Sequence, residues 1–405
     1  MKKIVSLAIM LIIIVSSFTF SFNVQAKYYG DYDCKTLKDG TLRIEMYYGD
    51  KEKLTIPKKL GGKKVTEIGK GAFERAELLE NLTIGGNIKS IGAHAFYCSP
   101  LKTIKIEEGL KSISDYTFAN SRKLKEITFP KSLKSIGELA FYECSSLKKI
   151  TFLSKSTKID NGAFYASGYY DEKTNWGEDK SLYCGKYLLD VDKYCPEDFK
   201  IKKGTCVIAD AAFDYNKNIK KIVIPSSVNY IGEYAFNDSF LEKVTIENGV
   251  KEIGAHAFDD CLFKTITIPP SVKKMGEDAV YGGIDGREFK HLTIKGCYNS
   301  AAEKYAKYKG VNFVPLNPKT PKFSVKAGKK SFKVTYKKVK GALGFQVKYK
   351  QGKTWKTKLY KTKKTVTKKI KAKKGACKVK IRSYKIDYNR KIYSKWTKIK
   401  KVTVK

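Results

Sequence analysis

A repeat of 22 or 23 residues constrains the fold of this 405-residue chain more than any other feature. Each copy has an Ile followed five residues later by a Phe, and an Ala precedes nearly every Phe. Eight copies begin at Ile68, Ile91, Ile113, Ile136, Ile159, Ile208, Ile231 and Ile253, and Met275/Val280 is a degraded ninth. Most copies also contain a Leu-x-x-Ile-x-Ile pattern, such as Leu101/Ile104/Ile106, whose alternation predicts a short strand.

A period this short predicts a solenoid, in which each turn of the chain packs on the next. One repeat cannot bury its own apolar face, so each turn must present the same apolar set to its neighbour. We expect the Phe to fill the core and the Ala to let the backbones approach. The Gly that often follows the Ile is expected to turn the chain, at Gly69, Gly92, Gly137, Gly232 and Gly254. The predicted fold class is mainly β, with a solenoid of about nine repeats over residues 65–316.

Two stretches, "FPKSLKSIGELAFYECSSLKKITF" (129–152) and "IPSSVNYIGEYAF" (224–236), resemble the BspA-type leucine-rich repeat of bacterial surface proteins. The resemblance implies an N-terminal hairpin cap at 27–64, with Asp39-Gly40 suited to a type I′ turn. It also implies a C-terminal cap helix near 300–310, starting at Ser300 with Glu303 as its capping-box partner. Characterised members of the family act in adhesion, so it further implies a secreted or surface-exposed protein that binds host matrix proteins or other bacteria.

The N-terminus predicts export of the chain. Lys2 and Lys3 precede an apolar run from Ile4 to about Phe20, and Ala26 ends a stretch typical of a signal-peptide cleavage site. We therefore expect residues 1–26 to be a signal peptide and no transmembrane anchor to remain after cleavage. The C-terminus shows no sorting motif, so any association with the cell wall is expected to be non-covalent.

An insertion at 165–203 interrupts the repeat and doubles its spacing between Phe164 and Ile208. Within it, "LYCGKYLLDV" predicts a small hairpin that turns at Gly185-Lys186. One interpretation is a loop packed on the solenoid. The alternative is a ligand-contacting protrusion that uses the aromatic residues Tyr169, Tyr170 and Trp176.

The outward-pointing strand positions form a stripe of Thr and charged residues, which we name the strand stripe. Its members are Asn81, Thr83, Thr103, Lys105, Glu126, Thr128, Lys149, Thr151, Lys221, Val223, Lys243, Thr245, Thr265, Thr267, His291 and Thr293. β-branched Thr suits an exposed sheet for structural reasons alone. Solenoids also present their sheet face as a binding platform, so the stripe is the predicted binding surface, centred on Thr83, Lys105, Glu126, Thr128, Lys149, Thr151, Lys221, Lys243, Thr245, Thr265 and Thr267.

The nine cysteines do not define a disulfide framework. Cys98, Cys144 and Cys261 follow the repeat Phe by two or three residues, where the family often has a small buried residue. Cys184 and Cys195 flank the insertion hairpin and are the candidate disulfide, given the oxidising environment expected for an exported chain. No catalytic motif is found, the three histidines form no ligand set, and we expect neither a metal nor a cofactor.

Residues 317–405 have a different pattern and charge. Apolar and Lys positions alternate, as in Phe332/Val334/Tyr336 and Phe345/Val347/Tyr349, which predicts a small β-sandwich. The segment "GALGFQVKYK" (341–350) resembles fibronectin type III-like modules. From Lys319 onward there are 33 basic residues, 31 of them Lys, and one acidic residue, so this stretch carries +32 of the formal net charge of +41. Lys is suited to diffuse attraction.

The sequence therefore predicts a secreted or surface binding and adhesion protein rather than an enzyme. Its solenoid is expected to recognise a protein or glycan, and residues 319–405 to attract an anionic cell-wall polymer; nucleic acid is the less favoured partner because the chain is exported. Two alternatives stay open. One is an exported enzyme with its site in the 165–203 insertion, and the other is a self-assembling structural surface protein.

Overall fold

The computed structural model describes residues 27–281, 292–387 and 390–405, so the predicted signal peptide and His291 lie outside the described residues. The chain divides into two compact units. The first unit contains the residues up to Leu133 together with 139–150 and 164–169. The second contains 134–138, 151–163 and the chain from Tyr170 onward. The mainly β solenoid predicted from the repeat is confirmed in both.

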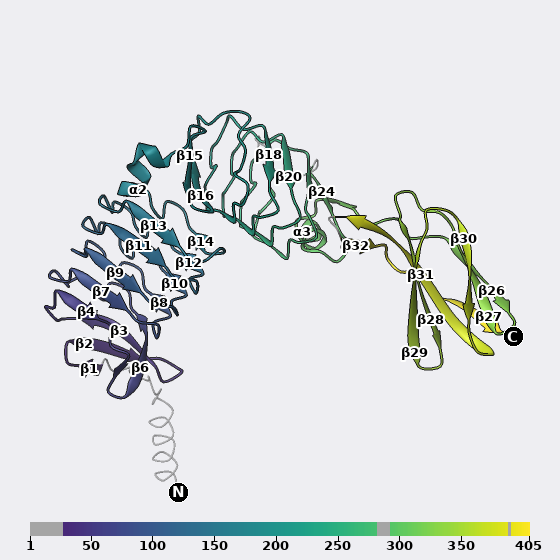
Figure 1. Ribbon diagram of the computed structural model, residues 1–405, viewed down its shortest axis with the longest axis horizontal. Coiled ribbons are helices and arrows are strands. Elements are labelled where there is room, and N and C mark those ends of the chain that lie inside the picture. The colour runs from purple at the N-terminus through teal and green to yellow at the C-terminus, as the bar shows by residue number, and fades with distance from the viewer. Residues whose placement is uncertain (1–26, 282–291, 388–389) are drawn as a thin grey trace, which may run out of the picture. The chain divides into compact units, whose positions relative to one another are not determined.

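The first unit begins with an antiparallel meander that continues into parallel repeat strands (Figure 1). The meander consists of β1 (Lys27–Tyr29), β2 (Tyr32–Thr36) and β3 (Leu42–Tyr47). The sheet continues in parallel through β6 (Lys63–Ile68), β8 (Ser90–Ile91) and β10 (Ser112–Ile113), and β5 (Lys59–Leu60) pairs with β6. A second row contains β4 (Lys53–Thr55), β7 (Asn81–Ile84) and β9 (Thr103–Ile106), and β11 (Glu126–Phe129) and β13 (Lys149–Phe152) follow along the chain.

The first hairpin corrects the predicted type I′ turn at Asp39-Gly40. The loop between β2 and β3 spans residues 37–41, and Gly40, but not Asp39, has a positive φ, of 81°. A type I′ turn needs positive φ at both central residues. The reason for the difference is local, because the Asp39 carboxylate accepts hydrogen bonds from the backbone N and the hydroxyl of Thr41, at 3.1 and 2.7 Å.

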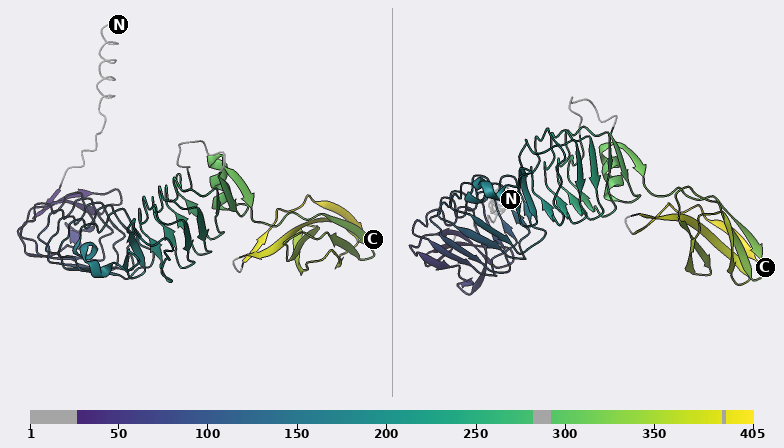
Figure 2. Two further views of the ribbon diagram at one scale, coloured as in Figure 1. Left: turned by 90° about the horizontal axis from the view of Figure 1, so that it is seen from above. Right: turned by 45° about the horizontal axis from the view of Figure 1, so that its top comes forward.

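The second unit repeats the two-row arrangement. β12 (Ser135–Ile136) pairs in parallel with β14 (Lys158–Ile159). One row is a separate six-stranded sheet of β15 (Ser181–Cys184), β16 (Tyr187–Val191), β17 (Val207–Ile208), β19 (Tyr230–Ile231), β21 (Glu252–Ile253) and β23 (Lys274–Met275). The other row contains β18 (Lys221–Ile224), β20 (Lys243–Ile246), β22 (Thr265–Thr267), β24 (Thr293–Gly296) and β25 (Asn312–Pro315). Figure 2 shows these turns as a regular stack.

The predicted insertion hairpin is confirmed. β15 and β16 are antiparallel, and Gly185 in the turn between them has a φ of 58°. β16 then pairs in parallel with β17, so the hairpin extends the sheet of the second unit. Two short helices precede it, α2 (Gly168–Asp171) and the 3₁₀ helix η1 (Lys173–Asn175).

A stack of buried Phe rings runs through the core of each unit, as the repeat predicts. In the first unit the rings of Phe73, Phe96, Phe118, Phe141 and Phe164 follow one another at 4.8 to 5.3 Å. In the second unit the Phe213, Phe236 and Phe258 rings are 4.5 and 5.1 Å apart. Stacked rings add to the apolar burial, so each turn stabilises its neighbour.

The Gly after the repeat Ile has a different role from the predicted one. Gly92, Gly232 and Gly254 do not have positive φ. Instead, a Cβ at Gly232 would lie 2.4 Å from the carbonyl carbon of Ala209 in the preceding turn. Other residues, such as Tyr234 and Asp238, have the left-handed backbone conformation. The glycine therefore permits close approach of neighbouring turns, and other residues turn the chain.

The C-terminal cap helix α3 (Ala301–Lys309) is confirmed. Ser300 is its N-cap and its hydroxyl accepts a hydrogen bond from Glu303 N, while the Glu303 carboxylate accepts one from Asn299 N. Gly310 ends the helix with a φ of 69°. The helix buries Ala302, Tyr305 and Ala306 against the last turns of the second unit.

The residues after Pro321 form two antiparallel sheets. The three-stranded sheet has the order β26 (Phe323–Gly328), β27 (Ser331–Tyr336) and β30 (Val366–Lys371). The five-stranded sheet contains β28 (Gly344–Gln351), β29 (Thr354–Lys361), β31 (Gly375–Asp387), β32 (Arg390–Tyr393) and β33 (Lys400–Val404). One apolar cluster takes residues from both sheets, among them Phe332, Val334, Phe345 and Val379. The predicted alternation of buried apolar residues and Lys residues is present in both sheets.

Candidate binding face of the solenoid

The strand stripe lies on the face of the second strand row that points away from the core. Lys105, Glu126, Thr128, Lys149, Lys221, Lys243, Thr245 and Thr265 are exposed, and Thr83, Thr151 and Thr267 are half-buried. The alternate residues of the same strands, such as Leu82, Ile222 and Ile266, are buried. The register of the short strands therefore places the stripe residues on the outer face and the apolar residues in the core, as predicted.

In the first unit the stripe residues pair with one another. Thr103 donates a hydrogen bond from its hydroxyl to Asn81 Oδ1 at 2.7 Å, and Lys149 Nζ lies 3.0 Å from Glu126 Oε2. A shallow groove of about 310 Å³ lies over β4, β7 and β9. Asn81, Thr103, Glu126 and Lys149 thus have partners within the stripe, which agrees with the structural interpretation of this part of it.

In the second unit the stripe forms a larger and more apolar groove of about 710 Å³. Its floor consists of β18 and β20, and its wall is the segment 197–201, which comes from the end of the insertion. We name this site the stripe groove. Val223 lies in it with 54% of its surface exposed, next to Pro225.

Two lysines line the stripe groove side by side. Lys221 and Lys243 are register partners in the parallel pair β18–β20, so they occupy adjacent strands about 4.8 Å apart. Both are exposed, and in the part of the chain that the structure describes neither forms an ion pair. Glu197 in the wall of the groove forms an ion pair with Lys220 at 3.2 Å. Adjacent like charges are unfavourable, so this pair of ammonium groups is suited to an external anion.

Sequence reasoning missed the contribution of segment 197–201. The signal was present, because Ile201 precedes Ile208 by seven residues just as Ile224 precedes Ile231. Phe199 and Ile201 therefore occupy the positions of Ile222 and Ile224 in a turn that lacks a regular strand. The insertion and the stripe were predicted as separate candidates, and the structure brings their residues together in one groove.

The aromatic residues of the insertion contact the protein itself. The Tyr170 hydroxyl donates a hydrogen bond to Asp190 Oδ2 at 2.6 Å, and Trp176 Nε1 donates one to the Tyr170 carbonyl at 2.7 Å. The two rings pack edge to face at 5.3 Å, and Tyr169 is half-buried. Burial raises the pKa of Asp190. These contacts favour a packed excursion over a ligand-contacting protrusion.

The structure does not join Cys184 to Cys195 by a disulfide. Both side chains are buried, and Asn216 Nδ2 lies 3.3 Å from Cys195 Sγ. The repeat cysteines differ among themselves. Cys144 and Cys261 are buried and donate to the carbonyls of Phe118 and Phe236, whereas Cys98 is exposed. The small buried position lies three residues after the Phe, and Cys98 follows its Phe by two.

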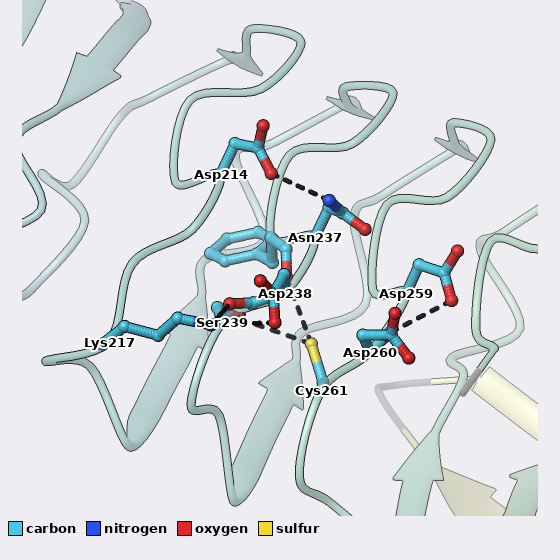
Figure 3. Close-up of polar contacts among 9 residues, drawn as sticks. Asp214, Lys217, Asn237, Asp238, Ser239, Asp259, Asp260 and Cys261 are labelled. Atoms are coloured by element: carbon cyan, nitrogen blue, oxygen red, sulfur yellow. Dashed lines mark hydrogen bonds and ion pairs between the residues drawn. The ribbon is translucent and has the colours of Figure 1, made fainter. Parts of the chain in front are cut away.

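A cluster of carboxylates lies on the turns that follow Phe213, Phe236 and Phe258 (Figure 3). Asn237 donates to Asp214 Oδ1 at 3.0 Å, and Lys217 Nζ lies 2.8 Å from Asp238 Oδ1. Burial raises the pKa of Asp214 and of Asp260, with Asp259 adding to the effect on Asp260. Over the described ranges, no group of three or more His, Cys, Asp or Glu residues is arranged to hold a metal ion. The Asp214–Asn237, Lys217–Asp238 and Ser239–Cys261 contacts in Figure 3 link successive turns of the solenoid.

The fold and the groove define a leucine-rich repeat solenoid with a solvent-facing strand row. A profile of the BspA-type leucine-rich repeat region matches residues 46–170 and 197–294 in six copies. The match covers more than half of the chain, and the protein belongs to the BspA-type leucine-rich repeat family. Proteins of this family are cell-surface or extracellular, which is consistent with a surface or protein-binding role.

Solved structures with similarity to the chain include other bacterial repeat proteins. A leucine-rich cell surface protein from Faecalibacterium prausnitzii is 20% identical, with 72% of this chain and 95% of that chain covered and a TM-score of 0.32. The pneumococcal vaccine antigen PcpA is 20% identical, with 73% and 99% covered and a TM-score of 0.33. A leucine-rich repeat protein from T. pallidum is 17% identical, with 72% and 98% covered and a TM-score of 0.34.

No curated relative matches the sequence significantly. Within the residues that the structure describes, no helix has the length and apolar character needed to cross a bilayer.

Proposed function

We propose that the protein is a secreted or surface-exposed binding protein that uses the stripe groove to hold a partner, in an adhesive role. The observation that carries the proposal is the pair Lys221 and Lys243 beside the exposed Val223. Like charges on adjacent strands cost stability, and the equivalent stripe pair in the first unit, Glu126 and Lys149, shows that an opposite-charge pair fits these positions. A partner that supplies the missing negative charge offsets this cost.

The lining of the groove indicates the chemistry of the partner. Lys200, Lys221 and Lys243 supply cations, whereas Phe199, Val223 and Pro225 supply apolar surface. The two acids of the lining are Glu197, which pairs with Lys220, and Asp198. An extended protein segment with acidic and apolar side chains could pair with these cations and contact this apolar surface. Apolar contact provides affinity that salt does not screen, and the lysines provide attraction that salt does screen.

The second part of the proposal concerns residues 317–405. We propose a fibronectin type III-like module that attracts anionic polymers of the cell envelope through its Lys side chains. Its strand orders, β26-β27-β30 and β29-β28-β31 with β33, support that class of module. The +32 charge of residues 319–405 supports the attraction.

A pair of charge variants tests the stripe groove. Purified full chain is applied to immobilised host matrix proteins and to bacterial cell walls, at low and at high salt. Lys221→Gln/Lys243→Gln is compared with Lys53→Gln/Lys105→Gln, which removes the same charge from the shallow groove over β4, β7 and β9. We expect binding of a protein target to weaken about tenfold or more in the first variant only, since each lost charge-assisted contact contributes on the order of 1 kcal/mol.

Two results would contradict the proposal in different ways. Equal binding by both variants and the full chain would remove the groove from the binding surface. No binding of the full chain to any protein target at either salt would remove the adhesive function.

A further inference from the structure

The outer face of the five-stranded sheet carries cations and aromatic rings in alternation. Lys380 Nζ lies 5.2 Å from the ring centroids of both Trp355 and Trp396. Lys348 Nζ lies 5.8 Å from the Trp355 centroid, and the Arg382 guanidinium lies 4.4 Å from Trp396 and 3.8 Å from Tyr393. We name this set the cation–aromatic ladder: Lys348, Trp355, Lys380, Arg382, Tyr393 and Trp396.

The rings hold the ladder cations in place. Cation–ring contacts of this length are attractive, and Arg382 Nε also donates a hydrogen bond to Gln346 Oε1 at 2.8 Å. The three cations are half-buried, unlike the exposed Lys378 on the same strand. A cation that is already ordered loses less side-chain entropy on binding, so a row of such cations binds an anion better than free lysines do.

The register of the strands sets the spacing of the cations. Lys348 on β28 faces Lys380 on β31, and Lys378 faces both Lys350 and Lys401. Neighbouring cations are therefore about 4.8 Å apart across strands and about 6.7 Å apart along a strand. Residues 319–405 contain a single acidic residue, so this grid depends on external anions for compensation.

We propose that the ladder face binds a linear phosphodiester polymer with polyol spacers, of the kind found in bacterial envelopes. The inference rests on the proposed attraction of this module to anionic envelope polymers and assigns it to one face. A polymer with one phosphate per three-carbon spacer presents charges at a spacing comparable to that of the ladder. Its spacers can contact the rims of the tryptophan rings.

The ring contacts distinguish this polymer from single-stranded nucleic acid. Proteins that bind single strands stack the bases on open aromatic faces. Here Lys348 and Lys380 lie over the Trp355 ring, and Lys380 and Arg382 lie over the Trp396 ring. The ring faces are thus occupied by cations, which leaves the phosphates as the groups to be recognised.

The three-stranded sheet provides a matched control surface. Lys326, Lys333 and Lys369 face one another across β26, β27 and β30, and all three are exposed. Among the described residues, none of these three lies over an aromatic ring. This triad has the same charge and similar spacing as Lys348, Lys380 and Arg382 but lacks their preorganisation.

The experiment compares the two triads in the full chain. Binding of purified poly(glycerol phosphate) is measured by calorimetry over a series of salt concentrations for the unaltered chain, Lys348→Gln/Lys380→Gln/Arg382→Gln and Lys326→Gln/Lys333→Gln/Lys369→Gln. We expect the ladder variant to bind about tenfold to a hundredfold more weakly, with a salt slope reduced by roughly 2 to 3. The control variant should stay close to the unaltered chain.

Three other outcomes would contradict the inference, and they distinguish its failure from failure of the proposed function. Equal weakening of both variants means that charge acts diffusely, so the ladder assignment fails and the attraction to envelope polymers stands. No binding by the unaltered chain at low salt refutes the attraction itself. Tighter binding of a single-stranded oligonucleotide of equal charge refutes the polyol phosphodiester as the ligand class.

Tryptophan fluorescence gives a second readout that needs no cation substitution. Two of the three tryptophans, Trp355 and Trp396, lie in the ladder, so Trp176→Phe leaves only ladder emission. The polymer should change this emission, and added salt should reverse the change. Binding detected by calorimetry without any change in emission would refute the ladder as the site.

Discussion

Substitution of Gly232 by Asn tests why the repeat contains glycine. Gly232 is buried, and a Cβ there would lie 2.4 Å from the carbonyl carbon and oxygen of Ala209 and 2.5 Å from Asp210 N. These distances are about 1 Å shorter than ordinary contacts, so the two turns must separate. Overpacking of this kind costs about 1–3 kcal/mol. Separation also strains the hydrogen bonds from Glu233 N to Asp210 Oδ1 and from Ala211 N to the Glu233 carbonyl, both 2.8 Å, each contributing about 1 kcal/mol.

The matched control is Gly185→Asn. Gly185 has a φ of 58°, and no atom lies within 4 Å of a Cβ built on it. Asn adopts this left-handed conformation readily, so we expect a cost of only a few tenths of a kcal/mol. The expected cost at Gly232 is about 2–4 kcal/mol. Urea unfolding of the full chain, followed by far-ultraviolet circular dichroism, measures both. Equal costs at the two positions would refute close approach of the turns as the reason for Gly232.

The remaining predictions concern pH and thiols. Burial raises the pKa of Asp210 to about 7, with Asp160 adding to the effect, so the folded state retains this proton to a higher pH than the unfolded chain does. The contribution of Asp210 to stability is therefore present below about pH 4 and is lost as the pH rises toward 7. Asp210→Asn should flatten that part of the stability profile and raise stability at pH 7, as urea unfolding over a pH series would show; an unchanged profile would contradict the assignment. For the cysteines, one of the nine is exposed, Cys98, and burial raises the pKa of Cys144 and of Cys261 to about 12. A thiol reagent at pH 8 should label about one thiol of the folded chain and nine after denaturation. A total of seven thiols after denaturation would indicate that Cys184 and Cys195 form a disulfide.

The solenoid could be predicted because its information is local and repeated. Ile and Phe recur at fixed spacing, and only a stack of turns lets every Phe become buried against the next. The insertion hairpin and the cap helix could be predicted for a similar reason. Gly185 and Ser300 act on the residues next to them, and the structure places a turn and an N-cap there.

The errors have different physical causes, one in the close approach of two turns of the solenoid and one in a local side-chain contact. The glycine at position 232 is explained by the backbone of Ala209, which lies 23 residues earlier in the chain. The loop at Asp39 differs because of a side-chain hydrogen bond to Thr41.

The sequence by itself determined the period, the buried face of each strand and the charge of the C-terminal module, since these follow from residue types and their spacing. Only the tertiary structure decided which candidate residues lie together. It joined segment 197–201 to Lys221 and Lys243, paired Glu126 with Lys149, and placed tryptophans beside three cations of the basic module. The reason is that a binding surface is assembled from neighbouring turns and strands, and their separation depends on packing between residues far apart in the chain.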